Sequence, residues 1–197
     1  DKILGSTYKK NTSVIEKYYD NKKIIRTKYT IQKSGSRINY LFKNKNHIST
    51  YGDSLTFCRY VNDNQTWQYH LSKKTKSNVK NYGVGNYGLD QTLLKIKTKK
   101  LKKIKKVIII FVPETISRIQ SYWKHFLEFG NILAFKPKYD LKNHKLILKK
   151  NHINLIKKDK IKKVIIRLQK KDYFFKNKFQ KYLFKFPYSI SFLRNFN

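Results

Sequence analysis

Gly52, Asp53 and Ser54 are the residues of this chain whose types and order could do covalent chemistry. They follow His47–Tyr51, a run of five residues with the composition of a β-strand. A strand that ends at a small-residue turn can lift a serine hydroxyl clear of the sheet edge, with the backbone N–H of that serine facing the same space. Ser54 is therefore a candidate nucleophile and oxyanion donor, and Gly52 and Asp53 support its turn. The same residues also suit a plain strand-ending turn with a capping serine.

A glycine-rich block, Asn-Tyr-Gly-Val-Gly-Asn-Tyr-Gly at positions 81–88, follows about thirty residues later. Together with Gly-Asp-Ser, it resembles the SGNH (GDSL) hydrolases, a family of serine esterases and lipases. The resemblance is close over residues 48–94 and looser through 107–112. It implies a nucleophilic Ser54 and a second oxyanion donor in the backbone N–H of Asn86, with Gly85 and Gly88 allowing positive φ and close approach. Without the serine, such a loop would equally suit a phosphate.

Two further features of the family are altered or absent. Glu114 occupies roughly the position where the family places an asparagine that donates to the oxyanion, whereas an ionised carboxylate can only accept hydrogen bonds. The Asp-x-x-His of the family, which supplies the base, does not occur; Asp140 and His144 are four residues apart instead. We expect the catalytic Asp and His to lie beyond Asn197. The polypeptide itself should then be nearly inactive, because a serine without its base is a poor nucleophile.

The charge of the chain suggests a different class of function. It has 46 Lys and Arg against 11 Asp and Glu, a formal net charge of +35. Such an excess is typical of proteins that bind nucleic acid or anionic polysaccharide. Compositional drift explains it as well, because Lys, Asn, Ile, Tyr and Phe are all abundant and the lysines are spread along the chain. We favour drift, and expect non-specific binding to anionic polymers as its side effect.

The remaining reactive side chains predict no additional chemistry. Cys58 is the single cysteine, and four residues beyond Ser54 it is expected to be a packing residue near the start of a helix. The five histidines lack partners at metal-ligand spacing, so we expect neither a metal nor a cofactor.

The order of elements predicts an α/β fold. Strands and helices alternate along the chain. We expect strands at 47–51, near 79–82 and, as an apolar run, at 107–112. The helices between them are centred on 66–72, with Asn64 as N-cap, and extend over 89–104. Such alternation indicates a mostly parallel sheet covered by helices. We predict a three-layer α/β/α flavodoxin-like sandwich, incomplete at both ends, in a domain spanning 47–197. Residues 1–46 should form an irregular arm with one or two strands.

The pattern is looser beyond the third parallel strand. We expect a helix over 114–129, a hairpin around 142–144 and lysine-rich amphipathic helices within 154–186. No methionine occurs, which suggests a piece of a longer or processed protein. An upstream membrane anchor would make it a bacterial extracytoplasmic protein, with a cytoplasmic location as the alternative.

These observations lead to two hypotheses of function. The first is a serine-dependent hydrolase that acts on ester substrates, such as an acylated carbohydrate, through an acyl-enzyme on Ser54. The second is a non-catalytic basic protein of the same fold that binds nucleic acid or an anionic polysaccharide.

Overall fold

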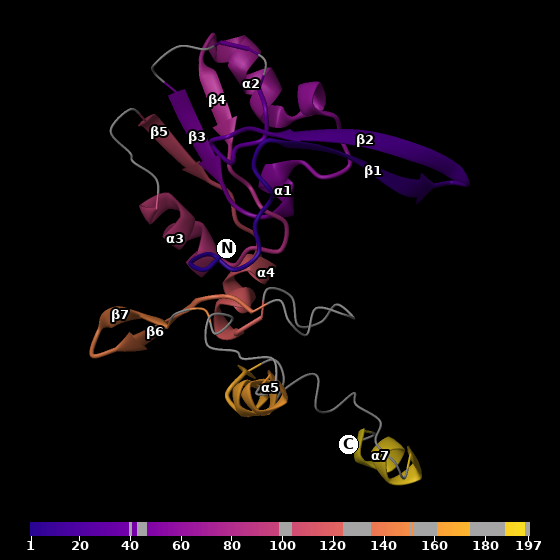
Figure 1. The fold of residues 1–197 in the computed structure, drawn as a ribbon, viewed down its shortest axis with the longest axis vertical. Coiled ribbons are helices and arrows are strands. Elements are labelled where there is room, and N and C mark those ends of the chain that lie inside the picture. The colour runs from indigo at the N-terminus through magenta and orange to yellow at the C-terminus, as the bar shows by residue number, and fades with distance from the viewer. Residues whose placement is uncertain are drawn as a thin grey trace. The chain divides into compact units, whose positions relative to one another are not determined.

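The computed structural model describes residues 1–39, 41–42, 47–98, 104–123, 135–149, 151, 161–173 and 188–195 (Figure 1). Contacts divide the chain into two compact units. One is Thr7–Ile116, and the other combines Asp1–Ser6 with Ser117–Asn197. The candidate residues 52–54, 85, 86 and 114 all belong to the first of these units.

A three-stranded parallel sheet forms the centre of the Thr7–Ile116 unit. β3 (His47–Tyr51) lies between β4 (Asn78–Asn81) and β5 (Ile104–Ile109). The β3 side chains from Ser49 to Tyr51 are fully buried, as expected of a parallel strand that is covered on both faces. The prediction of an α/β protein with a parallel sheet is therefore confirmed. The β5 strand begins and ends a few residues earlier than the expected 107–112.

Helices α2 (Trp67–Thr75) and α3 (Leu89–Lys97) contact opposite faces of β3. Gln68 of α2 donates to the side chain of Thr50, whereas Ile96 of α3 packs with Tyr51. Neighbouring residues of a strand point to opposite faces, so the two helices cover different sides of the sheet.

Two details of these helices differ from the prediction. Thr66, not Asn64, is the N-cap of α2, because its hydroxyl accepts from the N–H of Tyr69 at 3.2 Å. Asn64 lies instead within a short 3-10 helix, Asp63–Gln65. α3 ends at Lys97, and Ile104 already belongs to β5, so no single helix spans 89–104.

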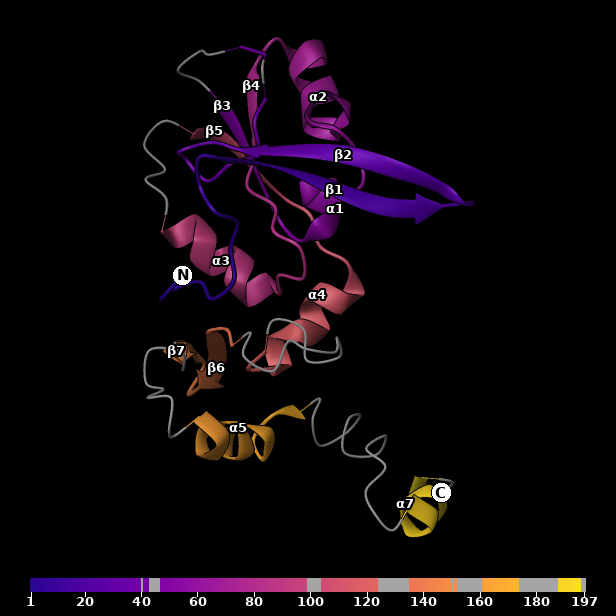
Figure 2. The ribbon, with the colours of Figure 1, turned by 45° about the vertical axis from the view of Figure 1, so that its right-hand side comes forward.

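Two nine-residue strands, β1 (Thr12–Asp20) and β2 (Lys23–Ile31), form a β-hairpin within residues 1–46, where an irregular arm with one or two strands was expected. The hairpin projects sideways from the parallel sheet in both views (Figures 1 and 2). Arg37 pairs with both Ile31 and Asn81 in isolated antiparallel bridges. It therefore connects the base of the hairpin to the outer edge of β4.

The second unit contains the antiparallel hairpin β6 (Lys138–Lys142) and β7 (Lys145–Lys149), which confirms the turn expected at 142–144. It also contains helices α5 (Ile161–Gln169) and α7 (Tyr188–Asn195). α5 confirms part of the helical prediction for 154–186, while 152–160 and 174–187 lie outside the described residues. None of the helices described here has the length and apolar character needed to cross a membrane.

The predicted helix over 114–129 is confirmed only at its start, and its described part beyond Ser117 departs from the α-helix. α4 (Pro113–Ser117) gives way to a short 3-10 helix, Arg118–Gln120, and then to extended chain. Trp123 is fully buried and forms a bridge with Phe135, in a core that also includes Ile165 and Leu168. The carboxylate of Asp172 accepts from both Ser121 and Tyr122 and holds the chain in this non-helical path. Residues 124–129 lie outside the described part of the chain.

Candidate active site

The turn that carries Ser54 begins at the carboxyl end of β3, the central strand of the parallel sheet. Gly52 has a φ of 153°, and a Cβ at this position would overlap the hydroxyl of Thr56 and the carbonyl oxygen of Ile110. Any other residue here would be strained and would also collide with its neighbours. The turn therefore needs glycine, and it aims the next two residues out of the carboxyl edge of the sheet.

Asp53 and Ser54 open the one-turn helix α1 (Ser54–Phe57). Asp53 is almost fully buried, and its carboxylate accepts the N–H of Leu55 at 2.9 Å as the N-cap of the helix. Ser54 is half-buried, and in the part of the chain that the structure describes its hydroxyl has no hydrogen-bond partner. Its N–H belongs to the first helical position, where the helix supplies no acceptor. Both groups are therefore available to a ligand.

The loop after β4 lies directly against the Ser54 turn. Val84 donates its N–H to the carbonyl of Gly52 at 3.0 Å. A Cβ at Gly83 would meet the backbone of Thr56 at 2.8 Å and would overlap the N–H of Phe57. The two glycine-containing loops are thus packed backbone to backbone.

We expected positive φ values at Gly85 and Gly88, but within this loop it is Asn86 that has one, at 63°. Gly85 instead donates its N–H to the hydroxyl of Tyr8 at 3.3 Å. The ring of Tyr8 stacks on Phe57 with a centroid distance of 4.4 Å. Asparagine is one of the few residues that tolerate the left-handed region, so Asn86 suits this position.

Glu114 lies in the first turn of α4, shortly after β5, and its side chain is exposed. Its carboxylate makes no hydrogen bond to Ser54. The adjacent end of β5 does reach the site, because Ile110 donates its N–H to Tyr51 at 3.0 Å and places its carbonyl over Gly52. All three parallel strands therefore contribute a connection to the same edge of the sheet.

Within the Thr7–Ile116 unit, no described His, Asp or Glu side chain is hydrogen-bonded to the Ser54 hydroxyl as a general base would be. His70 is exposed on α2, where it packs edge-on against Tyr69, and His144 occupies the β6–β7 turn with a φ of 58°. Asp140 is paired with Lys138 at 3.2 Å. The side chain of His47, and all of His125 and His152, lie outside the described residues.

Arg37 supports the Ser54 turn in a way that sequence reasoning missed. Its side chain is fully buried and paired with Asp63 at 2.8 Å. The same guanidinium donates to the carbonyls of Phe57 and Cys58, at 2.9 and 2.8 Å, at the end of α1. It therefore fixes the helix that Ser54 begins. No local signal marks Arg37, because its partners Asp63, Phe57 and Cys58 lie 20 or more residues away in the chain.

Cys58 ends α1 rather than lying near the start of a helix, with a φ of 59°. Burial raises the pKa of its thiol, and its sulfur lies 3.4 Å from the side-chain oxygen of Gln68. A raised pKa reduces the thiolate fraction, so Cys58 is a poor nucleophile. Within the described ranges, no group of three or more His, Cys, Asp or Glu side chains could hold a metal ion.

No protein-family model, curated protein or solved structure matches the chain significantly. The assignment to the SGNH hydrolases thus stays a prediction from the residues of 48–94. The described geometry provides a free serine hydroxyl, an adjacent free N–H and a second loop in contact. Among the described residues of the Thr7–Ile116 unit, no side chain is hydrogen-bonded to the Ser54 hydroxyl to take its proton.

Proposed function

We propose that Ser54 is the nucleophile of an enzyme that acts on acyl esters, in a domain with the three-layer flavodoxin-like fold of the SGNH hydrolases. The three parallel strands lie side by side in the order β4-β3-β5. Numbered by their order in the chain, this is 2-1-3, the arrangement at one end of a flavodoxin-like sheet. Ligands of such sheets bind outside the carboxyl ends of the strands, where Ser54 lies. The covering of β3 by α2 and α3 on opposite faces is consistent with this fold.

One observation carries the proposal. The Ser54 hydroxyl has no hydrogen-bond partner among the described residues, and it lies in a turn that accepts only glycine at position 52. In the proposed reaction, Ser54 Oγ attacks the acyl carbonyl, and its proton passes through a base to the leaving alcohol oxygen. The N–H of Ser54, with that of Asn86 as second donor, would stabilise the tetrahedral oxyanion. Water then hydrolyses the acyl-enzyme and restores the hydroxyl.

The chemistry of the site sets a limit on its rate. Because no described side chain accepts the Ser54 proton, acylation should be slow at neutral pH and should accelerate with hydroxide. Glu114 cannot replace the missing asparagine donor, and loss of one oxyanion donor costs about 10²–10³-fold. The substrate class, an ester on a carbohydrate, follows from the resemblance alone.

Acylation by p-nitrophenyl acetate, followed by peptide mapping, tests the proposal. We expect an acetyl ester on the peptide that contains Ser54, removed by hydroxylamine, while acetyl-lysine amides elsewhere resist it. Ser54→Ala should abolish the ester. Ser77→Ala is the matched control, because Ser77 is also half-buried but lies beyond α2. A parent protein with no hydroxylamine-sensitive acetyl group on Ser54 would contradict the proposal.

A further inference from the structure

A recess of about 990 Å³ lies where the base of the β1–β2 hairpin meets β4. Ser13 and Thr30 line it from the hairpin, and Asn78 and Lys80 line it from β4. Ser54, Asn86 and Glu114 are not among its lining residues. The volume is at the upper end of the range for small-ligand sites, so the recess could hold one or two sugar units.

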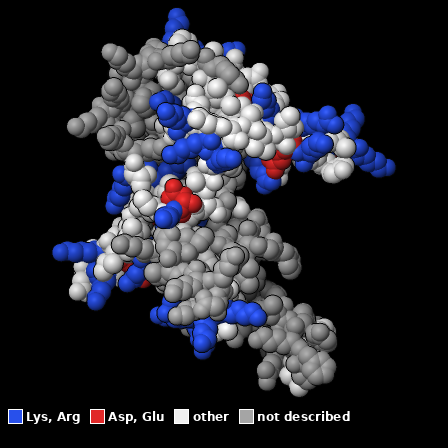
Figure 3. All heavy atoms as spheres, viewed as in Figure 1, with Lys and Arg blue, Asp and Glu red and all other residues white. Residues whose placement is uncertain are grey.

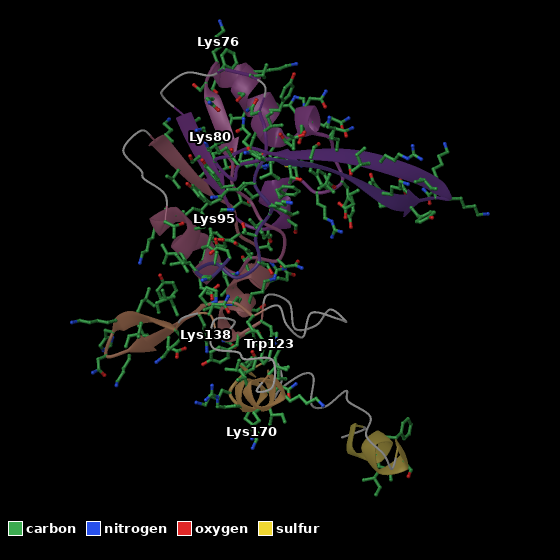
Figure 4. All side chains as sticks on the ribbon, in the orientation of Figure 1. Lys76, Lys80, Lys95, Trp123, Lys138 and Lys170 are labelled. Carbon is green, nitrogen blue, oxygen red and sulfur yellow. The ribbon has the colours of Figure 1, made fainter. Side chains whose placement is uncertain are left out.

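The recess is polar and positively charged. Among the lining residues that the structure describes, hydroxyl and amide side chains dominate, Phe42 is the one aromatic and none is acidic. Lys33 is exposed and Lys80 half-buried, and neither has an ion-pair partner among the residues described. Figure 4 labels Lys80 on β4. A half-buried ammonium that lacks an internal counter-charge favours an anionic ligand.

The outer face of the hairpin continues this surface. Ser13 and Thr30, whose hydroxyls are 3.2 Å apart, belong both to the recess and to this face. Farther along the same face come Lys28 and then the cross-strand pair of Lys17 and Arg26, all exposed. Strand alternation places the acidic residues of β1, Glu16 and Asp20, on the opposite face. Figure 3 shows the basic side chains along the projecting hairpin.

We propose that the recess and the outer face of the hairpin form a binding site for an anionic polysaccharide. Hydroxyls and amides in the recess match the hydroxyl groups of sugar rings, while Lys33 and Lys80 match a carboxylate, sulfate or phosphate on the same unit. Lys17, Arg26 and Lys28 then contact anionic groups on the following units. The site lies apart from Ser54, so it does not depend on the proposed esterase activity.

The lining favours a polysaccharide over a nucleic acid. Proteins that bind single strands without sequence preference stack successive bases on rows of aromatic side chains. Tyr19, 80% exposed near the hairpin tip, is the one aromatic on this outer face, and Phe42 is the one among the described residues of the recess.

Three double variants, each lowering the charge by two, test the site. Lys33→Gln/Lys80→Gln alters the recess, and Lys17→Gln/Arg26→Gln alters the hairpin. Lys74→Gln/Lys76→Gln is the control, because both lysines are exposed at the end of α2 and outside the recess. Dissociation constants are measured for heparin, polygalacturonate, neutral dextran and oligo(dT) over a range of salt concentrations, with circular dichroism as a check of folding.

We expect heparin or polygalacturonate to bind, dextran not to bind, and the recess and hairpin variants each to weaken binding about tenfold. The control should change it less than about twofold, and Ser54→Ala should leave it unchanged. Tighter binding of heparin would indicate that the site recognises sulfate or phosphate. Tighter binding of polygalacturonate would indicate that it recognises carboxylate. Equal loss in the control would overturn the proposal, since binding would then follow total charge. Tighter binding of oligo(dT) with the same variant pattern would also overturn it, in favour of nucleic acid.

Discussion

Val84 donates its backbone N–H to the carbonyl oxygen of Gly52 at 3.0 Å, which joins the loop after β4 to the turn that carries Ser54. The carbonyl of Ile110 covers the same glycine from the β5 side. Gly52 is therefore the point where the connections of all three parallel strands meet. A change in its conformation would disturb both the candidate nucleophile and the candidate oxyanion loop.

Gly52→Ala should destabilise the Thr7–Ile116 unit by about 3 kcal/mol or more. The substitution adds the strain of a left-handed φ to overlap with Thr56 and Ile110. Urea denaturation followed by circular dichroism measures the loss. Gly85→Ala is the matched control, because its φ is not positive and its Cβ would meet only the Tyr8 hydroxyl, at an ordinary 3.5 Å. Equal stability of the two variants would contradict the proposed role of the turn.

Arg37→Met should cost about 3–5 kcal/mol, because it removes the cation that pairs with the buried carboxylate of Asp63 and the donor to the carbonyls of Phe57 and Cys58. Part of this loss should be recovered in Arg37→Met/Asp63→Leu, in which no buried charge is left unpaired. The control Arg59→Gln breaks a half-exposed pair with Glu16 and should cost about 1 kcal/mol or less. A loss for Arg37→Met no larger than that of the control would show that the buried network contributes little.

Tyr51→Phe should leave stability within about 1 kcal/mol of the parent, or raise it. The hydroxyl of Tyr51 is buried and makes at most a weak contact with the side chain of Ser49, and burial raises its pKa to about 12. Tyr29→Phe is the contrasting case, because the Tyr29 hydroxyl bonds to Glu16, Thr27 and the N–H of Tyr60. It should lose about 1–3 kcal/mol. Thermal unfolding distinguishes the two, and a larger loss at Tyr51 would argue against so weak a contact.

The Glu16–Arg59 pair should make a small contribution to stability that depends on pH. The hydrogen bond from Arg59 lowers the pKa of Glu16 below its ordinary 4.5. The contribution is therefore complete above about pH 4.5 and is lost as the pH falls through the lowered value. The difference between the parent and Glu16→Gln, at most about 1 kcal/mol at pH 7, should shrink towards zero at pH 3. If the stability difference between the parent and Glu16→Gln grew as the pH fell, the pair would not lower the pKa of Glu16 and this prediction would be wrong.

Cys58 should react with iodoacetamide several times more slowly in the native protein than in urea at pH 8. Burial raises its pKa, so less thiolate is present in the folded state. Because Cys58 is the single cysteine, the total mass of the protein reports the reaction directly. Native rates equal to those in urea would place the thiol in solvent.

Local sequence patterns predicted the elements that depend on neighbouring residues. Composition and strand length located β3 within His47–Tyr51, and the polar turn at 142–144 located the β6–β7 hairpin. The small residues after β3 indicated a turn, although the need for glycine at position 52 comes from Thr56 and Ile110 packed against it. The expected helix over 114–129 failed where Trp123 is buried against Phe135, because tertiary packing outweighs helical periodicity.

Residue types and short-range patterns are enough to show that the chain is strongly basic, that it alternates strands and helices, and that a serine follows a strand at a glycine turn. Those features depend on residue type and on residues a few positions away. Only the tertiary structure placed Arg37 on Asp63 and the end of α1, and brought Lys33 and Lys80 into one recess. Such contacts join residues far apart in the chain. They form only when the sheet and the hairpin close on one another, so no local pattern can encode them.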